Sequence, residues 1–227
     1  MRSRRFHTWD VTPEEAIRLQ RELAPRVVRR DVGLRTPRLV AGMDVSYDKG
    51  SPWIYAAIVV LRLPDLSEVE TASVRTRAEF PYVPGLLSFR EAPAGLEAWT
   101  RLATRPDCLL CDGHGHAHPR RFGLASHFGL WINRPTVGCA KSVLIGAYRE
   151  PGQRRGSLSD LVHDGEVIGA AVRTREATSP VFVSAGHRVS LATAVTTVLA
   201  CAPRYRIPDP LRQAHALVNR MRQADRA

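Results

Sequence analysis

No apolar run in this chain of 227 residues approaches the roughly 20 residues that a membrane-spanning helix requires. The first residues, Met1–Arg5, are basic, but no apolar segment follows them. We therefore expect no signal peptide, no membrane partner and a cytoplasmic protein. With 44% hydrophobic and 24% charged residues, the composition is that of a folded protein. The length predicts a single domain over residues 1–227.

Cysteine is scarce, and at this length four cysteines do not make a disulfide framework. The run Cys108-Leu-Leu-Cys111 resembles half of a zinc knuckle, but its apolar character indicates a buried strand. Residues three apart on a strand point to opposite faces, so the two thiols cannot share one zinc ion. We interpret both cysteines as small core residues.

Lysine is scarcer still, because only Lys49 and Lys141 stand among the 33 basic residues. The 22 acidic residues leave a net charge of +11, which favours an anionic partner such as a nucleic acid. An arginine-rich surface from a biased genome would give the same total. Lys141 is more informative, because it lies within the otherwise apolar run 137–146. Its compact ammonium differs chemically from an arginine fork, so we treat Lys141 as a functional candidate.

The order of predicted elements indicates an α/β protein. A capping box at Thr12 to Glu15 predicts a first helix, and three strand-like runs then indicate an antiparallel meander. Helices and strands alternate afterwards, which predicts a mixed sheet with helices on both faces. The expected strands are 39–47, 52–63, 66–76, 108–111, 136–140, 167–173 and 181–184. The later helices are expected at about 93–103, near 122–129, and from Ser190 and Asp209, with a loop at 151–159.

Three carboxylates lie where such elements end or begin. Asp44 shares one strand face with Val40 and Gly42, where a buried carboxylate is costly unless it is paired or binds a metal. Asp112 directly follows strand 108–111, at the end where open α/β sheets place ligands. Glu91 precedes the helix expected at 93. The aspartates could share one cation if their strands are neighbours, but turn or cap roles remain open for both, as does a helix-terminus role for Glu91.

Two loops have compositions suited to ligand binding. The first loop contains Gly113 and Gly115 and three alternating histidines, His114, His116 and His118. Glycines let the backbone approach a ligand, and imidazoles can donate to phosphate or ligate metal. A structural role for each histidine is an equal alternative. In the second loop, Tyr82 stands between two prolines, which stiffen it and could present the ring as a wedge between bases. A tyrosine packed on the surface is the competing interpretation.

His215 lies beside the apolar stripe of the last predicted helix, where a histidine is more often a core residue than a ligand.

Taken together and in order, these segments resemble the endonuclease V family, whose fold is ribonuclease-H-like. The resemblance covers about residues 6–220, and its ordered set of motifs is highly specific although each motif alone is weak. The matching segments are 41–46, 80–91, 112–115 with 118–120, 125–127, 135–141, 186–188 and 206–210.

The resemblance implies a Mg²⁺-dependent DNA repair endonuclease, with Mn²⁺ expected to substitute for Mg²⁺. Such enzymes nick the second phosphodiester bond 3′ to deoxyinosine or another deaminated base, and leave a 3′-hydroxyl and a 5′-phosphate. Its partner would be inosine-containing DNA, with inosine-containing RNA a further possible substrate, and the protein would act as a monomer.

The resemblance also assigns roles to individual residues. Asp44 and Asp112 match the metal-binding aspartates, Glu91 the third acidic residue, and Lys141 a lysine beside the scissile phosphate. His215 stands where some members have Asp and others His, so it joins the catalytic candidates with its part in metal binding open. The strand-separating wedge would consist of Phe80, Pro81, Tyr82, Val83 and Pro84. A backbone-lined pocket for the flipped base would be formed at Leu87, Gly113, Gly115 and Gly123.

Two other interpretations make different demands on the sequence. A different ribonuclease-H-like enzyme, such as a nuclease for RNA–DNA hybrids, would need neither the wedge nor the glycine pocket. A nucleic-acid-binding protein that has lost catalysis would be expected to lack at least one of the three acidic residues or Lys141, and all are present.

Overall fold

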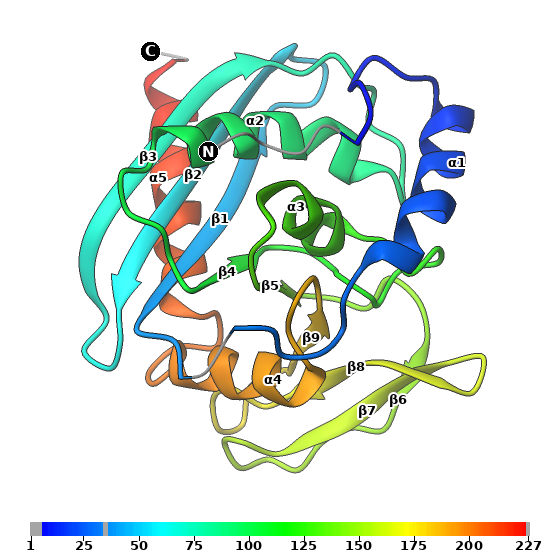
Figure 1. Ribbon diagram of the computed structural model, residues 1–227. Coiled ribbons are helices and arrows are strands. Elements are labelled where there is room, and N and C mark those ends of the chain that lie inside the picture. Colours follow the sequence, from blue (N-terminus) through cyan, green and yellow to red (C-terminus); the bar gives the residue numbers. More distant parts are fainter. Residues whose placement is uncertain (1–5, 34–35, 226–227) are drawn as a thin grey trace.

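The computed structural model describes residues 6–33 and 36–225, and the basic stretch Met1–Arg5 lies outside this part. Within the described residues, nine strands form one sheet (Figure 1). They are β1 (Leu39–Tyr47), β2 (Trp53–Arg62), β3 (Ser67–Arg77), β4 (Cys108–Cys111), β5 (Thr136–Ala140), β6 (Ala147–Tyr148), β7 (Leu158–His163), β8 (Glu166–Val172) and β9 (Val181–Ala185). Their order across the sheet is β3-β2-β1-β4-β5-β9-β8-β7-β6.

The helices lie on both faces of this sheet. They are α1 (Pro13–Leu23), a short 3₁₀ turn η1 (Ala24–Arg26), α2 (Leu87–Arg101), α3 (Leu124–Ile132), α4 (Leu191–Ala200) and α5 (Asp209–Ala224). Helices α2 and α3 pack against one face, while α4 and α5 pack against the other (Figure 1). In the described part of the chain, no helix has the length and apolar character needed to cross a membrane.

The topology confirms the predicted mixed sheet. Strands β1, β2 and β3 pair antiparallel as a meander, whereas β1, β4 and β5 pair in parallel. The capping box that opens α1 is also confirmed, because the backbone N–H of Glu15 donates to the Thr12 hydroxyl at 3.2 Å and the Thr12 N–H donates back to the Glu15 carboxylate at 2.8 Å. Local sequence signals and the long-range fold therefore agree over the first half of the chain.

Helix α2 begins earlier than the sequence predicted. Its first residue is Leu87, and Pro93, which was expected near the start, lies inside the helix. A proline within a helix costs about 3 kcal/mol, because it removes one hydrogen bond and crowds the preceding turn. Phe89 and Ala92 in the first two turns are nearly fully buried, so their packing outweighs this cost. Glu91 consequently lies within the helix instead of ahead of it.

Strands β6 and β7 were not predicted, whereas β8 corresponds to the expected strand 167–173. Residues 151–159 were interpreted as a loop, yet β7 begins at Leu158. Strand β6 has only two residues, and β7 is mostly exposed, so neither produces a clear apolar alternation. Helix α3 also continues three residues beyond the expected end, to Ile132, where Asn133 adopts a left-handed conformation that closes it.

Alternation along β4 divides the core into two layers. Leu109 and Cys111 belong to the cluster beneath α2 and α3, whereas Cys108 and Leu110 belong to the cluster beneath α4. The two cysteines therefore face opposite sides of the sheet, as predicted, and all four cysteines are buried free thiols.

Candidate functional site

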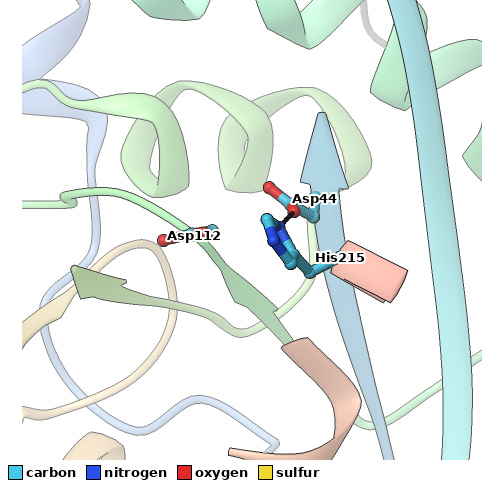
Figure 2. Close-up of side chains that lie close together, drawn as sticks. All are labelled: Asp44, Asp112 and His215. Carbon is cyan, nitrogen blue, oxygen red and sulfur yellow. Dashed lines mark hydrogen bonds and ion pairs between the residues drawn. The ribbon is translucent and has the colours of Figure 1, made fainter. Parts of the chain in front are cut away.

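The parallel pairing of β1 with β4 brings Asp44 and Asp112 together. Met43 is paired with Cys111, and the backbone N–H of Asp112 donates to the Met43 carbonyl at 3.2 Å. The residues after this pair, Asp44 and Asp112, therefore stand level on neighbouring strands. One ligand atom from each aspartate and one from His215 lie within 4.8 Å of one another. Figure 2 shows Asp44 and His215 in contact, with Asp112 on the neighbouring segment.

Helix α5 places His215 beside Asp44 because the helix packs very closely against β1. A Cβ atom at Gly42 would collide with the backbone of Pro210 and Leu211, so only glycine permits this packing. His215, one turn further along α5, then donates from Nδ1 to the Asp44 carboxylate at 2.6 Å. Its side chain is 54% exposed, so the alternative interpretation of a core histidine is wrong.

A second layer of hydrogen bonds fixes the His215 ring. The Asn219 amide, one helical turn after His215, lies 2.9 Å from Nε2. The Asn219 oxygen in turn accepts from the hydroxyl of Ser46 on β1 at 3.2 Å and from Arg222 at 3.0 Å. Because the oxygen is occupied by donors, the amide nitrogen faces Nε2, which leaves the proton of a neutral ring on Nδ1.

The site carries more negative charge than its surroundings neutralise. Burial, followed by the charge of Asp112, raises the pKa of Asp44, although the hydrogen bond from His215 opposes this. Burial and then the charge of Asp44 raise the pKa of Glu91 to about 8, against the hydrogen bond that Tyr47 donates at 3.3 Å. Carboxylates that repel one another in this way favour a bound cation.

Lys141 is the basic side chain that enters this acidic group. It lies just after β5 and pairs with Asp112. Burial acts to lower the pKa of Lys141, but the hydrogen bond and charge of Asp112 outweigh it and raise that pKa. The lysine backbone is held by Arg206, which donates to the carbonyls of Lys141 at 3.0 Å, Pro180 at 2.9 Å and Ser179 at 2.8 Å.

A pocket of about 360 Å³ opens beside the acidic residues. Glu91, Asp112 and Lys141 form part of its wall. Of the residues that the sequence assigned to substrate binding, Tyr82, Pro84, Leu87, Gly113 and Gly123 line it. Four others do not: Phe80 and Val83 pack in or against a core cluster, Gly115 is buried against the Ala185 carbonyl, and Pro81 is exposed.

The segment before α2 presents Tyr82 at the mouth of this pocket. Tyr82 is 61% exposed, whereas Phe80 is buried and its carbonyl accepts from Arg90 at 2.7 Å. Gly85 closes the segment with a φ of +77°, a conformation that favours glycine. The Gly85 carbonyl accepts three hydrogen bonds, from Gln20 at 3.0 Å, His118 at 2.9 Å and Arg120 at 2.8 Å. The backbone on both sides of Tyr82 is therefore held in place by hydrogen bonds.

The three histidines of the glycine-rich loop have different surroundings. His118 supports Gly85, and His116 lies 2.7 Å from the Glu166 carboxylate, so both have structural partners. His114 lines the pocket, burial lowers its pKa to about 4, and its buried Nδ1 has no hydrogen-bond partner among the described residues.

Sequence reasoning did not find several residues of the site. Tyr47 contacts Glu91, and Asn219 contacts His215. Gln20 and Ser88 line the pocket. The spacing of four residues between His215 and Asn219 on one helix was a usable signal. The other contacts join distant segments and have no local signature.

A carboxylate within β1 and another directly after the adjacent parallel strand β4, beside a lysine and a pocket in a basic chain, are the features of a nuclease of ribonuclease-H-like fold. Residues 21–216 match the model of the Endonuclease V family. Endonuclease V of Myxococcus xanthus is 50% identical over 218 residues, which cover 96% of this chain and 92% of that protein. The chain therefore belongs to the Endonuclease V family.

Solved structures agree with this assignment. The crystal structure of Endonuclease V from Streptomyces avermitilis is 44% identical, has a TM-score of 0.91, and is matched over 96% of both chains. Ciona intestinalis Endonuclease V, solved in complex with a 24mer DNA containing an inosine followed by a ribo-adenosine, is 30% identical with a TM-score of 0.84. That match covers 93% of this chain and 98% of the other.

Proposed function

We propose that this protein is a Mg²⁺-dependent DNA repair endonuclease that nicks the second phosphodiester bond 3′ to deoxyinosine or another deaminated base. The observation that carries the proposal is the position of the pocket. Its wall holds Glu91, Asp112 and Lys141 together with Leu87, Gly113 and Gly123. A base held among the latter would leave its own backbone close to the acidic residues. The inosine-containing DNA in the Ciona complexes supports this choice of substrate.

The donor set fits a hard divalent cation. Asp44 and Asp112 supply carboxylate oxygens, the ligands that Mg²⁺ and Mn²⁺ prefer. Burial, followed by the charge of Asp112, raises the pKa of Asp44. Asp44 and Asp112 would hold the ion, with His215 oriented beside them by Asn219. When bound, Mg²⁺ supplies a water of lowered pKa and positive charge for the phosphorane-like transition state.

Protein side chains would bind the phosphate, replace the extruded base and attract the nucleic acid. Lys141 places a point charge beside Asp112, where it would bind the scissile phosphate, and its backbone is fixed by Arg206. Tyr82, exposed on an anchored segment, would replace the extruded base in the stack. The net charge of +11 would attract the polyanionic strand.

Gel-resolved cleavage of end-labelled strands tests the proposal. Matched DNA strands with one deoxyinosine or with deoxyadenosine in its place, and an RNA strand with one inosine, are incubated with Mg²⁺ or with EDTA. We expect a nick only in the inosine strands and only with Mg²⁺, at the second bond on the 3′ side, leaving a 3′-hydroxyl and a 5′-phosphate. Equal cleavage of the adenine strand, or cleavage in EDTA, would contradict the proposal.

The wedge is tested with the same strands. Tyr82→Ala should reduce nicking of double-stranded inosine DNA about tenfold, because base stacking on an aromatic ring is worth roughly 1–3 kcal/mol. Nicking of single-stranded inosine DNA, which needs no strand separation, should fall less. Equal losses on the two forms would count against a wedge.

A further inference from the structure

A chain of hydrogen bonds leads from the pocket wall to the N-terminal segment. The Ser88 hydroxyl lies 3.0 Å from Nδ1 of His127. Nε2 of His127 lies 2.8 Å from Nε2 of His7, and Nδ1 of His7 lies 2.6 Å from the carbonyl oxygen of Thr8. His127 is completely buried, and the aromatic rings of Trp9 and Phe89 pack against both imidazoles. We call the four hydrogen-bonded residues, Ser88, His127, His7 and Thr8, the relay.

The Thr8 carbonyl determines the direction of every hydrogen bond in the relay. A carbonyl only accepts, so Nδ1 of His7 carries a proton. Burial lowers the pKa of His7 despite its backbone bond to Thr8, and burial lowers the pKa of His127 well below its usual value, so both rings are neutral. Nε2 of His7 is then an acceptor, and His127 must donate to it from Nε2. Nδ1 of His127 is consequently an acceptor, and the Ser88 hydroxyl donates to it.

This direction limits what Ser88 can offer to a ligand. Ser88 lines the pocket, and with its proton directed to His127 its oxygen has only lone pairs left. Two other polar side chains of the pocket, those of Gln20 and His118, have their hydrogen bonds directed elsewhere. Gln20 bonds the Gly85 and Phe122 carbonyls and Arg120, while His118 bonds the Gly85 carbonyl and the Arg120 backbone. Ser88 is therefore a fixed acceptor on this wall.

We propose that Ser88 is a specificity-determining residue that selects bases with a ring N–H, an inference that rests on the proposed function. Deamination turns an amidine edge into a lactam edge, so the ring nitrogen that accepts in adenine or cytosine becomes an N–H donor in hypoxanthine or uracil. A fixed acceptor bonds that N–H, directly or through one water. Against an intact adenine, two lone pairs face each other, and a site built for a donor rejects a partner that lacks it.

Single-turnover nicking of matched strands tests this inference. One strand carries deoxyinosine, and the other carries deoxynebularine, a purine whose N1 is a bare acceptor. Ser88→Ala should lower kcat/KM on the inosine strand about tenfold, and it should not lower kcat/KM on the nebularine strand, where it removes a lone pair that faces the bare N1. Ser126→Ala is the matched control, because Ser126 is a buried serine on the same helix as His127 whose hydroxyl has no partner among the described residues. Both strands should be cut by this control as by the wild type.

A second variant tests the direction of the relay. His7→Phe keeps an aromatic ring in the cluster but frees His127 to turn its proton toward Ser88, so the Ser88 hydroxyl can donate outward. The ratio of nebularine to inosine cleavage should then rise severalfold over wild type. Equal losses on both strands for Ser88→Ala, or an unchanged ratio for His7→Phe, would overturn the inference. If the wild type nicks inosine DNA while these ratios do not move, this inference fails alone; if it does not nick inosine DNA, the proposed function fails.

Discussion

Two groups of acidic side chains in this protein are built in opposite ways. At the site, Asp44, Glu91 and Asp112 face one another, and burial with like charge raises the pKa of Asp44 and brings that of Glu91 to about 8. At the turn between β7 and β8, Glu166 stands alone among basic groups. Burial opposes the shift there, but hydrogen bonds from His116 and Arg121 lower the pKa of Glu166 to about 2.

The difference separates a binding group from a structural one. Glu166 accepts from Arg121 at 2.8 Å and from Arg29 at 3.2 Å, so its charge is already neutralised by the protein and it joins three distant segments. At the site, Asp112 is paired with Lys141 and Asp44 with His215, and the charge of Arg90 acts on Glu91. The pKa values of Asp44 and Glu91 stay raised nonetheless, which favours a bound cation. Counting acidic residues in the sequence cannot distinguish the two arrangements.

The largest expected effect separates the two groups by activity. Asp112→Asn should reduce Mg²⁺-dependent nicking of inosine DNA on the order of 10³-fold, because metal-assisted stabilisation is worth several kcal/mol. Glu166→Gln, an equally conservative change in a group that touches no part of the pocket, should leave nicking within a few-fold of wild type. Initial rates at saturating Mg²⁺ measure both. Comparable losses in the two variants would show that the distinction is unfounded.

The same groups should have opposite effects on folding. The raised pKa of Asp44 means that its ionised form is less favourable in the folded state, so Asp44→Asn in EDTA should raise Tm by about 2–4 °C. Glu166→Gln should lower Tm, since its ion pairs with Arg29 and Arg121 are lost. Addition of Mg²⁺ should raise the Tm of wild type more than that of Asp44→Asn. Thermal unfolding followed by circular dichroism gives all these values, and a lower Tm for Asp44→Asn in EDTA would argue against charge crowding.

The smallest effect is a dependence on acid. Because the pKa of Glu166 lies below its ordinary value of 4.5, the ionised carboxylate stabilises the fold above that pH. This contribution should disappear as pH falls from 4.5 toward about 2. The Tm difference between wild type and Glu166→Gln should therefore shrink on going from pH 6 to pH 3, and a difference that is constant over this range would contradict the assignment.

Features of the fold that depend on neighbouring residues in the sequence could be predicted, and features that depend on contacts between distant segments could not. Strands β1 to β5 were predicted because each is rich in apolar or β-branched residues and is bounded by turn residues. Asp44 and Asp112 drew attention as acidic residues within or directly after such runs. The start of α2 at Leu87 was missed because Pro93 is a strong local signal that the buried Phe89 overrides. The relay, which joins His7 to Ser88 through His127, depends on three segments that only the folded chain brings together.

The contact between Gly42 and the start of α5 makes the acidic site depend on the docking of this helix. All nine described strands precede α5, so a chain that ended before Asp209 would contain every described strand while lacking His215. Its β1 strand would have an uncovered stripe where Pro210 and Leu211 rest. Removal of α5 would therefore take away one potential metal ligand and uncover the glycine face of β1 at the same time.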